Sequence, residues 1–151
     1  MISSKTKYGL HALFYLARKY GSGPVLIAEV AKRERMPKKF LEAILLELKN
    51  KGLLQSKKGK GGGYILGKHP SKIKMGEVIR ILEGPLAPVS CASQTAYHKC
   101  AECRDENTCE IRLVMKDVRE AIANILDKTS LAQAITRVEN TRSSKTLDYV
   151  I

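Results

Sequence analysis

Residues 51–66 read KGLLQSKKGKGGGYIL, and this stretch decides the fold. Residues 53–56 and 64–66 are short strand candidates, and the loop between them consists almost wholly of lysine and glycine. Glycine permits positive φ and a close approach of the backbone to another surface, while lysine supplies positive charge. The pattern predicts a β-hairpin wing. A nucleotide-binding loop is the alternative, but the stretch lacks the Gly-Lys-Ser/Thr ending and the strand–loop–helix order of such loops.

The residues before this stretch predict a helix-turn-helix. A first helix is expected over 3–20, because turn residues follow at 21–24. A short second helix gives way to a turn at 34–36, and Pro37 suits the first position of a third helix. That third helix should stop at Lys51-Gly52. The predicted buried residues are Leu10, Leu13, Phe14 and Ala17 in the first helix, Ile27, Val30 and Ala31 in the second, and Phe40, Leu41, Ile44, Leu45 and Leu48 in the third.

The residues after the wing predict three further helices. The first covers 71–84 and is followed by an irregular segment that opens with two prolines. A long amphipathic helix begins at Cys109, with an apolar stripe formed by Ile111, Val114, Val118, Ala121, Ile122 and Ile125. An apolar stripe of this length must be buried against another surface. We expect it to pack against the same helix of a second copy of the chain, and packing against the first helix is the alternative. Ser130 can cap a last short helix over 131–135, with a mobile polar tail over 139–145.

Charge divides the chain into two unequal parts. Residues 1–80 carry 18 Lys and Arg against 5 Asp and Glu, whereas residues 81–151 carry 9 against 10. A basic module beside a neutral one is typical of a polyanion-binding domain joined to a regulatory or dimerising part, and a merely soluble basic surface is the alternative. We find no apolar stretch long enough to span a membrane and no signal segment, so we expect a cytoplasmic protein.

All four cysteines fall within one short segment. Their spacing is Cys91-x8-Cys100-x2-Cys103-x5-Cys109, in a chain with no sign of secretion. Structural disulfides are not expected in a reducing cytosol, so clustered thiols indicate metal binding or redox chemistry. Thiolates are soft ligands that suit an iron–sulfur cluster or zinc. A thioredoxin-like use of Cys100-Ala101-Glu102-Cys103 would imply an enzyme, but the βαβ context is absent, and neither a catalytic triad nor a carboxylate pair has support.

Several motifs together resemble the Rrf2 family of bacterial winged-helix regulators, over nearly the whole chain. They are Lys7-Tyr8-Gly9-Leu10 with Ala12-Leu13, Ile27-Ala28-Glu29, Phe40-Leu41-Glu42 with Leu45 and Leu48, the stretch 51–66, Leu82-Glu83-Gly84 and Thr129-Ser130-Leu131. The resemblance implies a homodimer and a transcription regulator, which we expect to be a repressor and not an enzyme. Many members carry an iron–sulfur cluster on three cysteines just ahead of the dimerisation helix.

DNA contacts are expected at the start of the third helix and in the wing. A helix-turn-helix places its second helix in the major groove, where lysine can donate to guanine and glutamate can accept from cytosine. The wing lysines should lie against phosphates or in the minor groove. The predicted DNA-binding residues are Met36, Pro37, Lys38, Lys39 and Glu42 in the helix and Lys57, Lys58 and Lys60 in the wing. A two-fold dimer implies a pseudo-palindromic duplex operator, with an RNA target as the alternative.

The cysteine pattern departs from that of the family. Cys103 and Cys109 keep the family's five-residue gap, but the first cysteine is further away and Cys100 is extra. Arg112 stands where some relatives use a histidine, and His11 is the nearest N-terminal candidate where others supply a carboxylate. We therefore predict an all-cysteine site on Cys91, Cys100, Cys103 and Cys109. The cofactor is a 2Fe–2S or 4Fe–4S cluster, with zinc as the alternative.

The predicted fold class is mainly α: a winged helix-turn-helix with a two-stranded β wing and a long C-terminal dimerisation helix. We divide the chain into a DNA-binding domain over 1–84, a cysteine-rich cofactor loop over 85–109, and a dimerisation helix with a C-terminal tail over 110–151.

Overall fold

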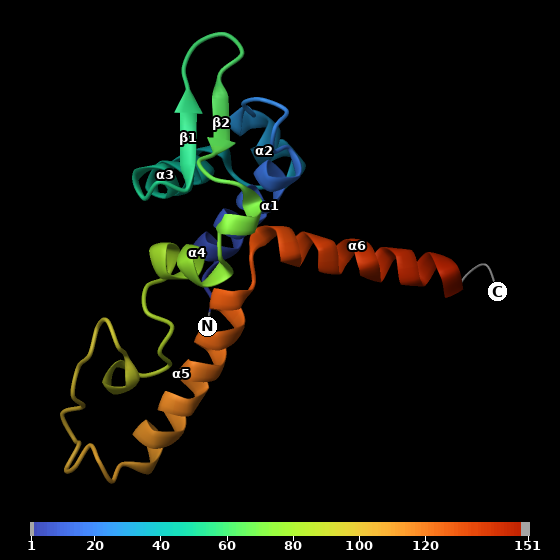
Figure 1. Cartoon of the computed structure of the whole chain (residues 1–151). Helices are drawn as coiled ribbons and strands as arrows, with labels where there is room; N and C mark the ends of the chain where they lie inside the picture. Colours follow the sequence, from blue (N-terminus) through green and yellow to red (C-terminus); the bar gives the residue numbers. More distant parts are fainter. Residues whose placement is uncertain (1, 149–151) are drawn as a thin grey trace.

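The computed structural model describes residues 2–148 and is mainly helical, with one two-stranded antiparallel sheet (Figure 1). This confirms the predicted fold class. The elements are α1 (Ser4–Arg18), α2 (Ile27–Arg33), α3 (Lys38–Asn50), β1 (Leu54–Lys57), β2 (Gly63–Leu66), the 3-10 turn η1 (Pro70–Lys72), α4 (Met75–Leu82), the 3-10 turn η2 (Ser90–Ala92), α5 (Glu110–Lys128) and α6 (Leu131–Asp148). Residues 149–151 of the predicted C-terminal unit lie outside the described part.

The first three helices pack around a shared aliphatic core. Leu13 of α1 is fully buried, as are Leu41, Leu45 and Leu48 of α3, as their helical spacing predicts. Phe40 is an exception, because it is 42% exposed and does not belong to the buried stripe of α3. Its ring instead meets Tyr8 of α1 edge-on, with the centroids 5.7 Å apart.

The wing is the predicted hairpin. Leu54 pairs with Leu66 at its base, where both side chains are buried, and Lys57 pairs with Gly63 at the other end. A two-way backbone bridge between Val25 and Tyr64 joins β2 to the segment that leads into α2, with N···O distances of 2.9 and 2.8 Å. The hairpin is therefore held by its buried base and by this bridge along β2, and it rises beyond the helices (Figure 1).

The end of α4 is attached to the start of α1 through one carboxylate. Glu83 accepts hydrogen bonds from the Ser3 backbone N–H at 2.9 Å, the Ser3 hydroxyl at 2.8 Å and the Thr6 hydroxyl at 2.5 Å. Hydrogen bonding from Thr6 and Ser3 lowers the pKa of Glu83 from 4.5 to about 2. The predicted Leu82-Glu83-Gly84 motif thus closes the N-terminal unit on itself.

The long helix α5 packs against α4 at its C-terminal end. Arg80 donates two hydrogen bonds to Asp127, at 2.6 and 2.9 Å, and this ion pair lowers the pKa of Asp127. Gly76 permits the close approach, because a Cβ there would lie 2.0 Å from Asp127 Oδ1. The sequence predicted one helix over 71–84, whereas the structure has η1 followed by a shorter α4.

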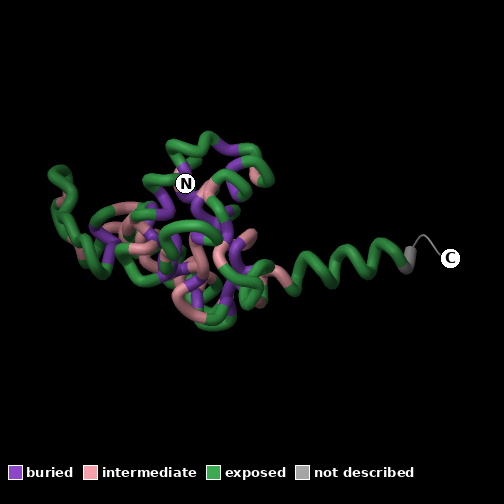
Figure 2. Tube along the Cα trace, turned by 90° about the horizontal axis from the view of Figure 1, so that it is seen from above, coloured by how far each residue is buried: buried purple, intermediate pink, exposed green. Residues whose placement is uncertain are grey.

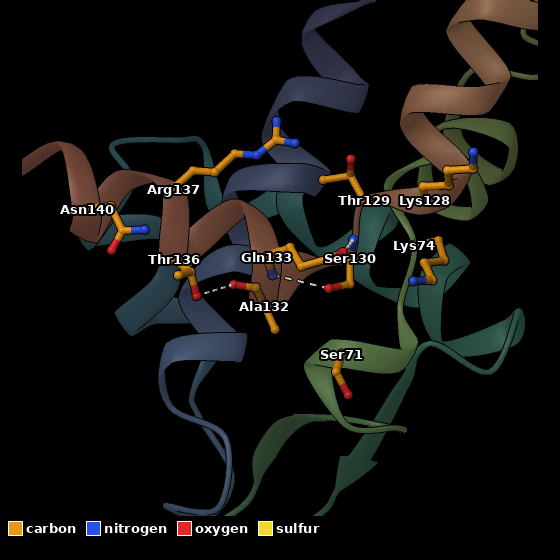
Figure 3. A pocket seen from close by; sticks show the side chains of 10 residues that line it. All are labelled: Ser71, Lys74, Lys128, Thr129, Ser130, Ala132, Gln133, Thr136, Arg137 and Asn140. Atoms are coloured by element: carbon orange, nitrogen blue, oxygen red, sulfur yellow. Dashed lines mark hydrogen bonds between the residues drawn. The ribbon is translucent and has the colours of Figure 1, made fainter.

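The chain turns sharply between α5 and α6. The Thr129 carbonyl accepts a hydrogen bond from the Met75 N–H at 2.9 Å, and the Leu131 N–H donates to the Ile73 carbonyl at 3.0 Å. These two bonds attach the turn between α5 and α6, which we call the elbow, to the extended segment before α4. Leu131 is fully buried in the main core. Figure 3 shows the hollow of about 630 Å³ on this elbow. The residues that line it are mostly of polar types: Ser71, Lys74, Lys128, Thr129, Ser130, Ala132, Gln133, Thr136, Arg137 and Asn140.

The last helix is much longer than predicted. The sequence indicated a short helix over 131–135 and a mobile tail over 139–145, which was wrong, because α6 continues to Asp148. The chain over 131–148 contains neither glycine nor proline. Its hydroxyl side chains bond to carbonyls one turn back, as Thr141 does to Arg137 and Ser144 to Asn140. A polar composition therefore did not prevent helix formation.

The apolar stripe of α5 lies in solvent in the single chain. Ile111 is 66% exposed, Val114 56% and Ile125 60%, while α6 projects from the body with residues 136–146 exposed (Figure 2). The alternative in which this stripe packs on α1 is therefore not what the structure shows. The division into 1–84, 85–109 and 110–151 stays a prediction. No helix within residues 2–148 has the length and apolar character needed to cross a membrane.

Candidate nucleic-acid interface and cysteine loop

The start of α3 presents polar side chains to solvent. Pro37 was predicted at the first position of this helix. It is instead the N-cap residue, and the helix begins one residue later, at Lys38. Pro37, Lys38, Lys39 and Glu42 are all exposed. Since the first turn of a second helix in this motif faces the major groove, these groups stand where base edges are reached.

Met36 differs from the other predicted contact residues. It is only 6% exposed and belongs to the main core, and its backbone N–H donates to the Ala31 carbonyl at 3.0 Å. The side chain fills the inside of the turn between α2 and α3, so we remove it from the proposed base contacts. The preceding Arg35 takes the left-handed conformation that closes this turn, with φ of 53°.

A surface hollow joins the recognition helix to the wing. It has a volume of about 280 Å³ and lies between the start of α2, the start of α3 and the loop-side end of the two strands of the hairpin. Its lining includes three of the predicted contact residues, Lys38, Glu42 and Lys57, together with Ala28 and Ser56. The fold thus brings the helix and the wing, separate in sequence, onto one face.

The lysines on this face carry uncompensated charge. Lys57, Lys58 and Lys60 of the wing are exposed, as are Lys38 and Lys39 of α3. None of the five forms an ion pair with another residue in the described range 2–148. Exposed lysines without an acidic partner are suited to neutralising phosphates.

The sequence reasoning missed one further residue on the same helix. Leu46 lies one turn beyond Glu42, and its side chain is 50% exposed. In the sequence analysis it was not distinguished from the buried leucines of this helix. The three- and four-residue spacing from Lys39 and Glu42 could have found it, because these positions share a face opposite to the buried stripe. An apolar side chain there suits contact with a thymine methyl group.

The four cysteines differ in how far they are exposed to solvent. Cys91 is buried within η2, Cys100 is exposed, and Cys103 and Cys109 are half-buried, with Cys109 at the N-cap of α5. Hydrogen bonding to Cys91 and the negative charge of the neighbouring thiolates raise the pKa of Cys100. Within residues 2–148, no three His, Cys, Asp or Glu side chains converge in a way that could hold a metal ion. Four thiols are suitable ligands for a metal cofactor, but the described conformation does not bring them together around one.

Two arginines of α5 hold the cysteine-bearing turn. Arg112 donates to the Cys91 carbonyl at 3.0 Å and to the Glu106 carbonyl at 3.3 Å. Arg119, only 8% exposed, donates to the Ala92 carbonyl at 2.9 Å. In the sequence analysis, Arg112 was noted only because it stands where some relatives use a histidine, and nothing signalled Arg119. We call these two side chains the arginine latch.

His11, which was weighed as a ligand, and His98 of the cysteine loop have other neighbours. His11 Nδ1 lies 3.3 Å from the Glu34 carboxylate, at the turn between α2 and α3. The backbone of His98 exchanges hydrogen bonds with Ser90. The all-cysteine donor set stays a prediction.

The helix-turn-helix, the hairpin wing and the shared basic face define a winged-helix DNA-binding protein. Residues 2–137 match the family Rrf2, described as an iron-dependent transcriptional regulator. The chain belongs to the Rrf2 family of transcriptional regulators. The relatives below are named as transcriptional regulators, a class that is not enzymatic.

Similar proteins span nearly all of the chain. It is 40% identical over 134 residues to an rrf2-like HTH-type transcriptional regulator of Rhodobacter capsulatus, covering 87% of this chain and 89% of that one. It is similar in structure to CymR, the global cysteine regulator of B. subtilis, with a TM-score of 0.75, 34% identity, and coverage of 91% and 97%. IscR of T. potens has a TM-score of 0.74, 30% identity, and coverage of 93% and 90%.

Proposed function

We propose that this regulator binds a pseudo-palindromic duplex operator as a homodimer and acts as a repressor. The observation that carries the proposal is the shared hollow, which holds Lys38 and Glu42 of α3 beside Lys57 of the wing. A helix in the major groove and a wing on the adjacent backbone would engage one half-site together. Two-fold symmetry then sets two such half-sites one helical turn, or a multiple of it, apart.

The roles of these residues follow from their chemistry. Lys38 and Lys39 can donate to guanine N7 and O6 or to phosphates, while Glu42 can accept from cytosine N4. The exposed wing lysines contact phosphates or the minor groove and contribute mostly without regard to sequence. Sequence preference therefore depends on the helix, and a large part of the affinity on the wing.

The dimer forms through α5. Its exposed apolar stripe, with Ile111, Val114 and Ile125, would be covered by the same stripe of a second copy. In sedimentation experiments on the full chain, Val114→Glu together with Ile125→Glu should give a monomer. Leu46→Glu, on the exposed face of α3, is the matched control and should remain dimeric. A dimer that persists in the double variant would contradict this interface.

Selection from random duplexes, followed by footprinting, tests the operator. The expected result is a palindromic preference, which a thiol enzyme or an RNA-binding protein would not show. Glu42→Gln should relax the preference at one base pair in each half-site, with a discrimination loss of about 1–3 kcal/mol. Lys51→Gln, at the C-terminal end of the same helix, is the control and should keep the preference. An unchanged preference in Glu42→Gln would exclude this residue as a reader.

The cofactor proposal concerns Cys91, Cys100, Cys103 and Cys109. We propose a 2Fe–2S or 4Fe–4S cluster that modulates operator binding, with structural zinc as the alternative. The all-thiol donor set and the family's description as iron-dependent support it. Because the described conformation does not gather these donors, binding would require the segment between them to rearrange.

Anaerobic purification with iron, sulfide and zinc analysis tests the cofactor. Matched iron and sulfide that decrease in Cys103→Ala and Cys109→Ala would support the cluster. One zinc per chain would assign a structural site, and metal-free protein with full operator affinity would remove the cofactor from the function.

A further inference from the structure

A second hollow lies beside the wing and is separate from the recognition helix. It is bounded by the end of α1, by the turn over 21–25 and by both strands of the wing, and none of the described residues of α3 lines it. Its volume is about 560 Å³. Sites for small organic molecules commonly have about 300–1,000 Å³. We call this feature the α1–wing hollow.

The interior of the α1–wing hollow is apolar. Leu16, Val25 and Leu66 line it, and all three are buried members of the main core. Tyr20 and Ile65 add apolar surface nearer to solvent, where Tyr20 is 47% exposed. A concave apolar surface of this kind is suited to the hydrocarbon body of an organic ligand.

The charged groups of the hollow favour an anion. Lys19 and Lys57 line it, whereas none of its described lining residues is acidic. Neither lysine forms an ion pair within residues 2–148. Lys19 Nζ lies 5.9 Å from the centre of the Tyr15 ring, a contact that offsets its charge only in part.

These two properties together define the class of ligand. A neutral organic molecule would remove the two ammonium groups from water without providing a partner for their charge. A small hydrated inorganic anion would provide that charge but would leave the apolar interior in water. A ligand that combines an apolar body with one carboxylate satisfies both requirements.

We propose that the α1–wing hollow binds a small organic monoanion, a carboxylate with an aromatic or branched aliphatic body, and that the bound ligand weakens operator binding. The effect on DNA rests on the proposed function. The binding of the ligand does not, because it requires only the hollow and its two lysines.

Lys57 connects this hollow to the DNA-binding face. It also lines the other hollow, beside Lys38 and Glu42. A carboxylate that pairs with Lys57 therefore removes one cation from the phosphates. Val25 and Tyr64 line the α1–wing hollow as well, and their backbone bridge holds β2 in place. Ligand and operator should therefore weaken each other's binding by the same factor.

Binding is tested by calorimetry on the full chain with three probe compounds. 1-Naphthoate has both the aromatic body and the carboxylate, acetate has only the charge, and 1-naphthamide has only the body. 1-Naphthoate should bind once per chain, and the other two at least about ten-fold more weakly, because each lacks one of the two interactions. The absence of saturable 1-naphthoate binding at millimolar concentration, or equal binding of 1-naphthamide, would overturn the proposal.

The site is located by a pair of variants at the end of α1. Lys19→Gln should lower the affinity for 1-naphthoate by about ten-fold, because one charge-assisted hydrogen bond is lost. Arg18→Gln removes the same charge from the neighbouring residue, which does not line the hollow, and should keep the wild-type affinity. Equal losses in the two variants, or no loss in Lys19→Gln, would overturn the assignment to this hollow.

The coupling is tested with the selected operator duplex. Saturating 1-naphthoate should lower operator affinity by at least about five-fold and should reduce the slope of log affinity against log salt by about 1. In Lys57→Gln the ligand should cause no further change in this slope. Unchanged operator affinity of the wild type saturated with 1-naphthoate would overturn the coupling. Protein that binds 1-naphthoate but no duplex would contradict the proposed function alone.

Discussion

Replacing Gly63 with alanine should damage the attachment of the wing to the segment before α2. Gly63 has φ of +146°, and a Cβ there would lie 2.3 Å from the Val25 carbonyl oxygen and 2.5 Å from its carbon. These are backbone atoms, so no side-chain rotation can relieve the clash. The same Val25 carbonyl accepts from Tyr64, in the bridge that fixes the hairpin to the body. Alanine must therefore strain its own backbone and push this bridge apart.

The cost has two parts. Alanine in a sparsely populated φ region costs about 1–3 kcal/mol. Loss of the two hydrogen bonds of the Val25–Tyr64 bridge costs about 0.5–1.5 kcal/mol each. The free energy of unfolding should fall by about 2–6 kcal/mol. For a chain of this size, a loss of about 4 kcal/mol lowers Tm by about 8–16 °C.

Gly61→Ala provides the matched control. Gly61 also has positive φ, +76°, but a Cβ there meets nothing within 4 Å. Only the backbone strain remains, so the loss should be about 1–2 kcal/mol. Urea and thermal unfolding of both variants, followed by circular dichroism, measure the difference. If Gly63→Ala were no less stable than Gly61→Ala, the clash with Val25 would not be what requires glycine at this position.

Three other perturbations follow from the structure. The pKa of Glu83 is lowered from 4.5 to about 2, so the ionised carboxylate stabilises the folded state. This contribution to the free energy of unfolding is present above pH 4.5 and is lost as pH falls toward 2. The stability difference between wild type and Glu83→Gln, measured by urea unfolding, should narrow over that range, and a constant difference would contradict the hydrogen-bond assignment. Leu131→Ala removes a fully buried side chain and should cost about 2–5 kcal/mol, while the exposed Val138→Ala should change stability by less than about 0.5 kcal/mol. Replacing Lys58 and Lys60 with glutamine should reduce the slope of log affinity against log salt by about 2, at unchanged sequence preference, and an unchanged slope would place both lysines away from phosphates.

The sequence alone determined the elements whose signals are local. The stripe of Leu41, Ile44, Leu45 and Leu48 required a one-sided helix, and the glycine- and lysine-rich loop required a hairpin. The motif set around 51–66 identified the family, and the exposed polar residues at the start of α3 followed from the position of the helix-turn-helix. Local signals failed for α6, because a polar segment without glycine or proline can remain helical as easily as it can be disordered.

Only the tertiary structure decided which neighbours each side chain meets. Met36 and Phe40 are both apolar and both near the start of α3, yet one is buried and the other lies against Tyr8 at the surface. The arginine latch joins residues far apart in sequence, through a segment without periodicity. No spacing rule covers such contacts, because they depend on how the chain between them folds back. The sequence specified most of the helices and the wing, whereas the contacts of α5 with η2 became visible only in the tertiary structure.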